Sequence, residues 1–224
     1  MIIAIDGPSG AGKGTLARAV ADRLQFRHVD TGAMYRAVAW KAQAEGIDLD
    51  DELALAERAA TAAFEQTGAV IVIDGHDVTR AIRTPEMDKA AARVARLPKV
   101  RDVLVDRQRA LGRIGGVVME GRDIGTVVFP GADVKIYLDA SPEERARRRA
   151  ADAAHTGQAG TLAGVQSDIV ARDQSDSTRA VAPLTLAPDA IYIDTTSLSI
   201  EETVERVMAL VHERNQETGI RNQE

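Results

Sequence analysis

The chain has 224 residues, 45% of them hydrophobic, and its 28 basic against 34 acidic side chains give a formal net charge of −6. This length predicts one domain with a substantial core, and the acidic balance argues against broad, nonspecific binding to nucleic acid. The absence of cysteine excludes disulfides, a thiol nucleophile and a cysteine-based zinc site, and without a signal peptide or a long apolar run we expect a cytoplasmic protein that makes no membrane contact.

A glycine-rich turn follows the first apolar segment. A strand is expected at residues 2–5 and a helix at 13–24, and the turn between them reads Gly7-Pro8-Ser9-Gly10-Ala11-Gly12-Lys13-Gly14-Thr15. Such a turn lets several backbone N–H groups point at one anion, and the positive end of the helix dipole adds to their field. The lysine can reach the outer phosphates of a nucleoside triphosphate. Residues 7–15 therefore predict a P-loop that holds the phosphates of a nucleoside triphosphate.

The P-loop departs from the usual pattern at one position. Gly14 stands directly after Lys13, where other P-loops carry a hydroxyl that ligates Mg²⁺, and the hydroxyl comes one residue later, at Thr15. We expect Mg²⁺ to be held through waters, by Thr15, or mainly by the nucleotide, and we assign no protein residue as its ligand. The Gly-Lys-Gly-Thr variant resembles the nucleoside monophosphate kinases.

Apolar strands and helical patterns then alternate along the chain. Further strands are expected around 28–29 and at 117–119, 134–138 and 191–193, with a helix at 100–111. Two helix starts are marked by Ser141-Pro142-Glu143-Glu144 and by Ser199-Ile200-Glu201-Glu202, the second before a last helix at 203–212. The alternation predicts an α/β fold with a parallel sheet covered by helices, and a site beyond the carboxyl ends of the strands.

Three of these strand ends are followed by arginine. The segments are 30–36 with Arg36, 120–126 with Arg122, and the helix after 134–138 with Arg145, Arg147, Arg148 and Arg149. Pairing within the helix, with Glu143 or Glu144, explains Arg147 as well as a site does. Three adjacent arginines cannot all share two glutamates, so we expect Arg148 or Arg149 to face the crevice beside the P-loop.

A second basic cluster follows a stretch rich in Ala, Gly, Thr and Gln at 151–164, which predicts a mobile loop. Arg172 and Asp176 lie four residues apart and share a helix face, and Arg179 stands at the expected helix end. The cluster is either a solvated surface with a salt bridge or the far side of an arginine-bearing lid.

The interval between Trp40 and Arg101 is longer than one crossover helix requires. It contains a strand and turn with hairpin character at 69–78, and a helix that begins at Thr84-Pro85-Glu86 and runs toward 96. We interpret it as a small subdomain inserted into the α/β core. It is either a substrate-binding flap or a hairpin that only packs on the core.

Together, these motifs closely resemble bacterial cytidylate kinases, from the first residues to the last helix. The resemblance is carried, in order, by the P-loop, Asp-Thr-Gly-Ala-Met-Tyr-Arg (30–36), Ile-Arg-Thr-Pro-Glu (82–86), Glu-Gly-Arg-Asp-Ile-Gly-Thr-Val-Val-Phe-Pro (120–130) and Asp-Ser-Thr-Arg-Ala-Val-Ala-Pro-Leu (176–184). It implies a P-loop nucleoside monophosphate kinase fold in a single domain, 1–224. Within it, 31–110 is a monophosphate-binding region with an insert, 145–178 a short helical lid, and the remainder the core.

The implied reaction is transfer of the γ-phosphoryl group of ATP, with Mg²⁺, to CMP or dCMP, by a protein expected to act as a monomer. No general base is needed, because the acceptor is a phosphate oxygen that is already anionic. The reaction does need cations that bring several anionic groups together, and a lid that excludes water.

The resemblance also implies roles for individual residues. The catalytic cations are Lys13, Arg122, Arg179 and one of Arg148 and Arg149. Arg36 and Arg122 bind the acceptor phosphate, and Arg179 joins them on closure. Arg172 and Asp176 contact the ribose, and Arg101 and Asp123 read the cytosine edge. Thr31 and Tyr35 belong to the substrate-binding set, although Tyr35 is as readily explained as a core residue, and Asp123 as a partner of Arg122 or an outer group around Mg²⁺.

One departure from the family bears on specificity. Relatives often carry a serine that touches the base nine residues before Arg101, and this chain has Ala92 there. A lost neutral hydrogen bond costs about 0.5–1.5 kcal/mol. Discrimination against UMP is therefore an open question for this chain.

Two alternatives to a CMP kinase remain open. The first is another P-loop kinase, of the UMP, AMP, dTMP or shikimate type. The second is an ATP-binding P-loop module without transfer activity, which would have no need for the second arginine cluster.

Overall fold

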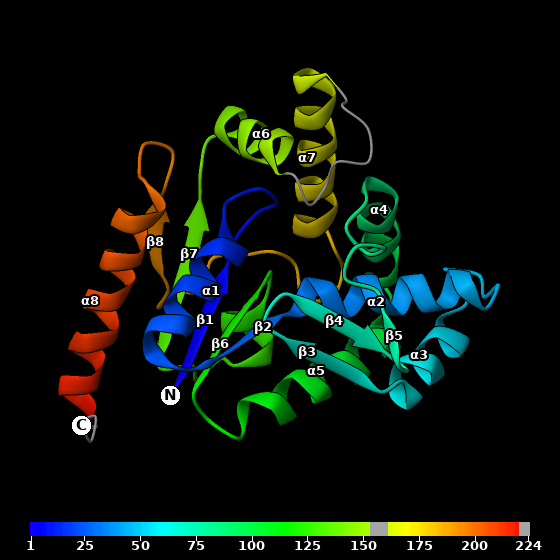
Figure 1. Cartoon of the computed structure of the whole chain (residues 1–224), viewed down its shortest axis with the longest axis horizontal. Coiled ribbons are helices and arrows are strands. Elements are labelled where there is room, and N and C mark those ends of the chain that lie inside the picture. Colours follow the sequence, from blue (N-terminus) through cyan, green and yellow to red (C-terminus); the bar gives the residue numbers. More distant parts are fainter. Residues whose placement is uncertain (153–160, 220–224) are drawn as a thin grey trace.

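The computed structural model describes residues 1–152 and 161–219 (Figure 1). Its centre is a five-stranded sheet in the order β2-β6-β1-β7-β8, and every neighbouring pair is parallel. The strands are β1 (Ile2–Asp6), β2 (Arg27–Asp30), β6 (Val117–Gly121), β7 (Val134–Asp139) and β8 (Ile191–Asp194). Each contains the segment predicted from sequence, so the expected parallel α/β sheet is confirmed.

Helices cover both faces of this sheet. The described residues form the helices α1 (Lys13–Leu24), α2 (Thr31–Ala44), α3 (Glu52–Thr61), α4 (Pro85–Val94), α5 (Pro98–Gly112), α6 (Pro142–Ala151), α7 (Leu162–Ser177) and α8 (Ile200–Thr218), with a π-helical turn at Ile124–Val128. Side chains alternate between the faces of a strand. Ile3 and Ile5 of β1 accordingly pack with α1 and α8, while Ala4 packs on the opposite face with Val105 of α5. No helix among the described residues is both long enough and apolar enough to span a bilayer.

The two helix starts that the sequence marks with serine are confirmed. At α8, the N–H of Glu202 donates to Ser199 Oγ (3.1 Å) and the N–H of Ser199 donates to Glu202 Oε2 (2.8 Å), which is the reciprocal capping box. The helix begins three residues before the expected start and runs beyond the expected end. At α6, Ser141 Oγ accepts from the N–H of Glu144 (3.2 Å), but the Glu144 side chain turns to arginines instead of closing the box.

The inserted region is more elaborate than one hairpin. A separate antiparallel sheet is formed by β3 (Phe64–Thr67), β4 (Val70–Ile73) and β5 (His76–Asp77), and β3 was not expected. Ile71 and Ile73 of β4 pack with Ala33 and Ala37 of α2. This small sheet therefore rests on α2, while α4, which follows it, faces the central cleft.

The prediction of a mobile loop at 151–164 is wrong at the carboxyl end of that range. Thr161 caps α7, its Oγ1 accepting from the N–H of Gly164 (3.2 Å), so residues 162–164 form the first turn of a helix. At the other end, Ala151 is the last residue of α6. Residues 153–160, the middle of the predicted loop, lie outside the described part of the chain.

Candidate active site

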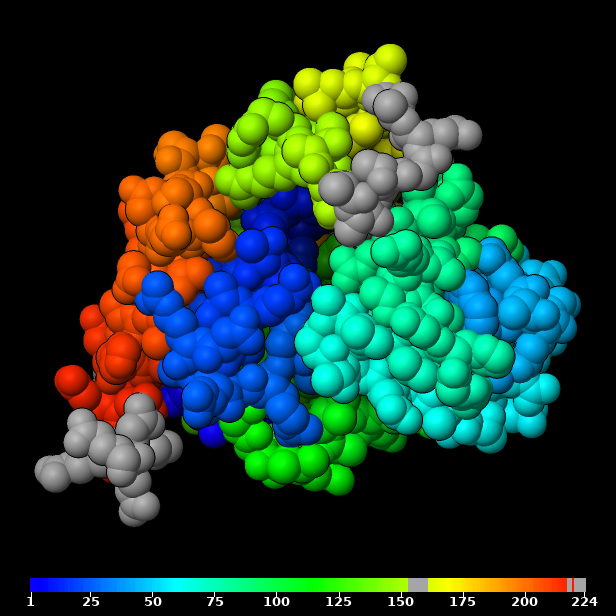
Figure 2. All heavy atoms as spheres, in the orientation of Figure 1, coloured from blue at the N-terminus to red at the C-terminus, as the bar shows by residue number. Residues whose placement is uncertain are grey.

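A cavity of about 1120 Å³ opens at the carboxyl ends of β1, β2 and β6, between the P-loop, α2, α4 and the α6–α7 pair. Figure 2 shows the hollow below α6, with the P-loop region visible inside it. Most of the predicted site residues line it, namely Ser9, Gly10, Lys13, Gly14, Thr15, Thr31, Tyr35, Arg36, Arg101, Arg122, Asp123, Arg149, Arg172, Asp176 and Arg179. Residues far apart in sequence thus meet where the parallel-sheet rule places a site.

The P-loop is held in place by backbone geometry. Gly7, Gly10 and Gly12 have φ values of 148°, 77° and 93°, in a range that L side chains rarely adopt. A Cβ on Gly7 would lie 2.0 Å from the carbonyl oxygen of Leu138 in β7. The N–H of Ser9 donates to Asp173 Oδ1 of α7 (2.9 Å), so this loop is tied to α7 as well as to the sheet.

Lys13 is buried at the start of α1, and its Nζ donates to the carbonyl oxygen of Pro8 (2.6 Å). Burial, with the positive charge of Arg122 adding to it, lowers the pKa of Lys13 from 10.5 to about 7. An anion bound at the P-loop would favour the charged form. A phosphate there would add its negative charge to that of Glu120, Asp173 and Asp176, which already favour the charged lysine.

Arg36 comes from the second turn of α2, and Asp30 caps that helix. Asp30 Oδ1 accepts from the N–H of Ala33 (2.9 Å), and its Oδ2 accepts from Arg36 Nη2 (2.9 Å). Burial would raise the pKa of Asp30, but Arg36 and the helix N–H outweigh it and the pKa is lowered. Arg36 Nε is buried without a partner among the described residues, so one donor of this guanidinium remains unpaired at the cavity.

Arg122 and Arg172 meet at one carboxylate. Asp176 Oδ2 accepts from Arg122 Nε (2.9 Å) and from Arg172 Nε (3.3 Å), and the Asp176 side chain is only 2% exposed. Burial alone would raise the pKa of Asp176, but the two arginines outweigh it and the pKa is lowered. The expected helix-face pairing of Arg172 with Asp176 is therefore confirmed, and it is joined to the end of β6.

Arg101 and Asp123 form a buried ion pair on the far wall of the cavity. The Arg101 guanidinium lies 5.7 Å from the centre of the Tyr35 ring. Burial raises the pKa of Asp123 although Arg101 opposes it. Tyr35 packs in the α2 core and also lines the cavity, so both of its expected roles are compatible with its position.

The adjacent arginines of α6 separate. Arg149 lines the main cavity and pairs with Asp88 of α4. Arg148 turns to the other side of the P-loop, where its Nη1 donates to Thr195 Oγ1 (2.9 Å) and its Nη2 to the Thr195 carbonyl (2.7 Å). It lines a smaller cavity of about 230 Å³ with Ala11 and Gly12. Arg147 pairs with Glu144, as ordinary helix pairing predicts.

Sequence reasoning gave no role to Glu120 and Asp88, two of the carboxylates that line the main cavity. Glu120 is in a motif that was noted, but it received no role. A Cβ on residue 14 would lie 3.1 Å from Glu120 Oε1, so Gly14 leaves room for this carboxylate beside the P-loop helix. Glu120 Oε1 is also 2.9 Å from His28 Nε2 of β2. Asp88, the second carboxylate, lies outside every motif recognised in the sequence.

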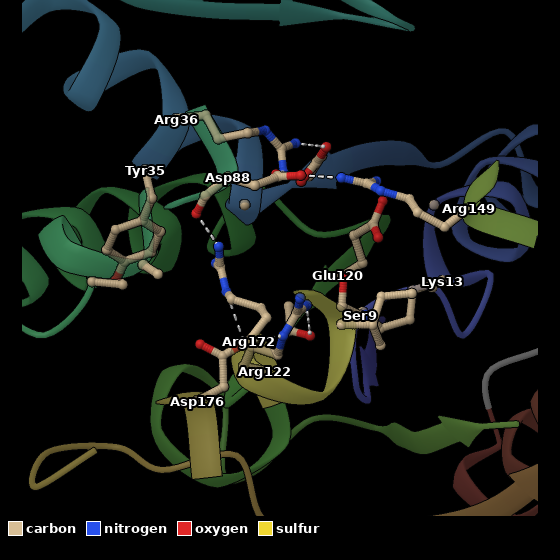
Figure 3. Close-up of a pocket in the computed structure, with 18 of the residues that line it drawn as sticks. Ser9, Lys13, Tyr35, Arg36, Asp88, Glu120, Arg122, Arg149, Arg172 and Asp176 are labelled. Carbon is tan, nitrogen blue, oxygen red and sulfur yellow. Dashed lines mark hydrogen bonds and ion pairs between the residues drawn. The ribbon is translucent and has the colours of Figure 1, made fainter. Parts of the chain in front are cut away.

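Figure 3 shows these side chains converging. Arg36, Arg149, Arg172 and Arg122 surround Asp88 and Asp176, with Lys13 and Glu120 on the P-loop side. Such an arrangement stabilises two phosphate groups that lie close together, because several guanidinium groups can contact their oxygens at once.

Comparisons with known proteins identify the family of this chain. Residues 3–213 match the Cytidylate kinase family. The curated cytidylate kinase of Geobacillus sp. (strain WCH70) is 51% identical over 216 residues, covering 95% of this chain and 96% of that protein. That of Desulfitobacterium hafniense (strain Y51) is 50% identical over 224 residues, covering 99% and 97%. Among solved structures, a gluconokinase from Sinorhizobium meliloti 1021 has a TM-score of 0.50 at 15% identity, covering 98% of this chain and 97% of that one, a likeness of fold alone. The chain belongs to the cytidylate kinase family.

Proposed function

We propose that this protein transfers the γ-phosphoryl group of ATP to CMP or dCMP, giving ADP and CDP or dCDP. The observation that carries this proposal is the ring of arginines that faces the P-loop across one cavity. In that ring, Arg36 Nε and Arg179 Nε are buried and have no partner among the described residues. Buried donors without partners are costly unless a ligand binds them, and phosphate oxygens supply the acceptors.

The P-loop provides the donor side. Its N–H groups and the start of α1 bind the phosphates of ATP, with Lys13 at the outer end. The smaller cavity beyond the loop, lined by Arg148, Leu138 and Leu198, is where we place the nucleoside part of ATP. Arg148 thus contacts the donor, while Arg149 is the lid arginine that faces the transferred group.

The acceptor side needs no general base, since the attacking atom is an oxygen of a phosphate. Arg36 and Arg122 bind that phosphate, and Arg179 joins them. Arg172 and Asp176 contact the ribose. Lys13 and the arginines stabilise charge on the group in transfer, which is the main requirement of in-line phosphoryl transfer.

The surroundings of the P-loop fit a Mg²⁺ ion that takes most of its ligands from phosphate and water. Among the described residues no group of three or more His, Asp or Glu is placed to hold a metal. Thr15 and Glu120 lie in the same cavity wall, and Gly14 leaves the Glu120 carboxylate free to approach. We propose that Thr15 and Glu120 hold the ion, directly or through water. When bound, Mg²⁺ would neutralise phosphate charge.

Base recognition is assigned to Asp123 and Arg101. A carboxylate accepts from the exocyclic amine of cytosine, whereas uracil has a carbonyl at that position. Ala92 lines the same cavity but offers no hydroxyl, so we expect the Arg101–Asp123 pair to supply most of the discrimination against UMP.

The subdivision into a core, a monophosphate-binding region at 31–110 and a lid at 145–178 is part of the proposal. So is a monomer, for which the support is that one chain supplies residues on both sides of the cavity.

The test is ADP production from ATP and Mg²⁺ with CMP, dCMP, UMP, AMP, dTMP and shikimate offered separately. We expect strong turnover with CMP or dCMP and weak turnover with the others. Equal turnover with UMP would remove the base-reading roles of Arg101 and Asp123. Binding of ATP without transfer to any acceptor would overturn the proposed function.

A further inference from the structure

Asp88 is a negatively charged side chain at the place where the acceptor phosphate is expected. It lies in the first turn of α4, in the inserted region, and its carboxylate pairs with Arg149 of α6. The same carboxylate is 3.8 Å from Arg36 Nη1, and the backbone carbonyl of Asp88 accepts from Arg172 of α7. Arginines from three helices thus converge on one residue (Figure 3).

Resting on the function proposed above, we propose that Asp88 is a resident anion of the acceptor-phosphate site. In the empty cleft its carboxylate binds Arg149 and Arg36, and the phosphate of the incoming nucleoside monophosphate displaces it from them.

Asp30 and Asp176, which also pair with arginines of this cavity, are fixed by further contacts, and the Asp88 carboxylate is not. Asp30 also caps α2, and Asp176 is almost completely buried between two arginines. The Asp88 carboxylate is 23% exposed, and its described partners are Arg149 and Arg36. The cap of α4 is formed by Thr84, so the helix does not depend on the Asp88 side chain. The carboxylate is therefore free to withdraw when a stronger anion arrives.

Replacement of this carboxylate by a phosphate strengthens the electrostatic attraction between the anion and the arginines. A phosphate near neutral pH carries up to two negative charges and three oxygens, and it engages two guanidinium forks better than one carboxylate does. Burial lowers the pKa of Arg149, so this arginine gains from any anion that replaces Asp88.

The exchange also links acceptor binding to the position of Arg149. While paired with Asp88, Arg149 is neutralised and held toward α4, so it gives little stabilisation to a γ-phosphate that would react with water. Once the acceptor phosphate takes the place of Asp88, Arg149 contacts phosphate oxygens instead. Asp88 thus weakens the binding of monophosphates and suppresses ATP hydrolysis in their absence.

The decisive variant is Asp88→Asn, which keeps the shape of the side chain and removes its charge. We expect the dissociation constants of CMP and of inorganic phosphate, each titrated calorimetrically without ATP, to fall about tenfold because a like charge has been removed from the site. ADP formation from ATP without acceptor is expected to rise several-fold. Asp88→Glu, which keeps the charge, is expected to bind both ligands within about threefold of the unaltered protein.

Asp168→Asn is the matched control. Asp168 stands on the same cavity wall and pairs with Lys89 of α4 (3.4 Å), but it is 60% exposed and has no arginine partner among the described residues. We expect this control to change phosphate binding less than about twofold, because its charge is screened by solvent.

Unchanged or weaker binding of CMP and phosphate by Asp88→Asn would overturn the proposal, as would an equal gain in Asp168→Asn. A melting temperature near that of the unaltered protein verifies that the variant is folded. The phosphate titration keeps this test separate from the function itself. A protein that transfers nothing to CMP would overturn the proposed function, while tighter phosphate binding by Asp88→Asn would still support the resident anion.

Discussion

The P-loop side of the cleft and its acceptor side are stabilised in different ways. On the P-loop side, Ile3 and Ile5 are fully buried between helices, and the loop itself lies against the backbone of β7. On the acceptor side, the walls are joined by ion pairs between separate elements, such as Arg122 with Asp176 and Arg149 with Asp88.

This difference separates two tasks. Close packing and backbone contacts fix the donor phosphates in one geometry, because a packed interior does not deform continuously. Ion pairs between charged side chains can instead be exchanged for contacts with an anionic ligand at small net cost, since both arrangements satisfy the arginines. The acceptor side is therefore suited to a substrate that enters and leaves in every cycle.

Removal of an acceptor-side arginine is expected to give the largest effect. Arg122→Ala removes a cation that we propose binds the acceptor phosphate, and we expect kcat to fall about 10³-fold, or about 4 kcal/mol. ATP binding, measured by calorimetry, is expected to change little. A parallel loss of ATP binding would contradict the division between the two sides. Arg58→Ala is the matched control, because Arg58 pairs with Glu45 at the surface, away from the cavity.

A core substitution is expected to give the opposite pattern. Ile3→Ala empties space in the middle of β1, and we expect the free energy of unfolding to fall by about 3 kcal/mol while kcat at 25 °C is retained. Urea titration and initial rates measure the two quantities. Ile3→Val, which removes one methyl group, is expected to cost about 1 kcal/mol. A large loss of kcat in folded Ile3→Ala would show that the core and the chemistry are not separable.

Substitution of Asp123, the carboxylate that we propose reads the base, is expected to change selectivity more than rate. Asp123→Asn keeps the shape but offers both a donor and an acceptor, so it accommodates uracil as well as cytosine. We expect the ratio of kcat/KM for CMP to that for UMP to fall about tenfold. The ratio is measured with both acceptors at fixed ATP. An unchanged ratio would assign Asp123 to pairing with Arg101 alone.

The sequence was informative where local chemistry determines structure. Short apolar segments between helical patterns located the five parallel strands, and Ser141, Ser199 and Thr84 located three helix starts, because a capping side chain acts on its own helix. The strand β3 was missed, since its alternation is polar on one side and only half buried on the other. The start of α7 was missed because a glycine in its first turn is typical of a loop.

The candidate site could be predicted where residues lie in recognisable motifs. The division of Arg148 from Arg149 could not, because neighbouring helical residues point about 100° apart and the sequence does not fix how α6 is rotated against the P-loop. The position of Asp88 depends on how α4 packs across the cleft from α6 and α7. Such tertiary contacts join segments for which the sequence contains no shared pattern.

The smallest expected effect concerns the proton on Lys13. Its pKa is about 7 in the folded chain against 10.5 when exposed, so between these values the unfolded state binds more protons. The contribution of Lys13 to the free energy of unfolding therefore rises with pH through this window. Below pH 7 the folded state bears the whole cost of burying a charged lysine.

Phosphates at the P-loop favour the charged lysine, and at pH 8 we expect ATP binding to take up about one proton or less. Calorimetric titrations in Tris and in HEPES, whose ionisation enthalpies differ, measure this uptake. Lys13→Met is expected to abolish it. Equal binding enthalpies in the two buffers for the unaltered protein would mean that the lysine is already charged before ATP arrives. Carboxylates near the P-loop would then balance the charge of Lys13, as they balance the arginines on the acceptor side.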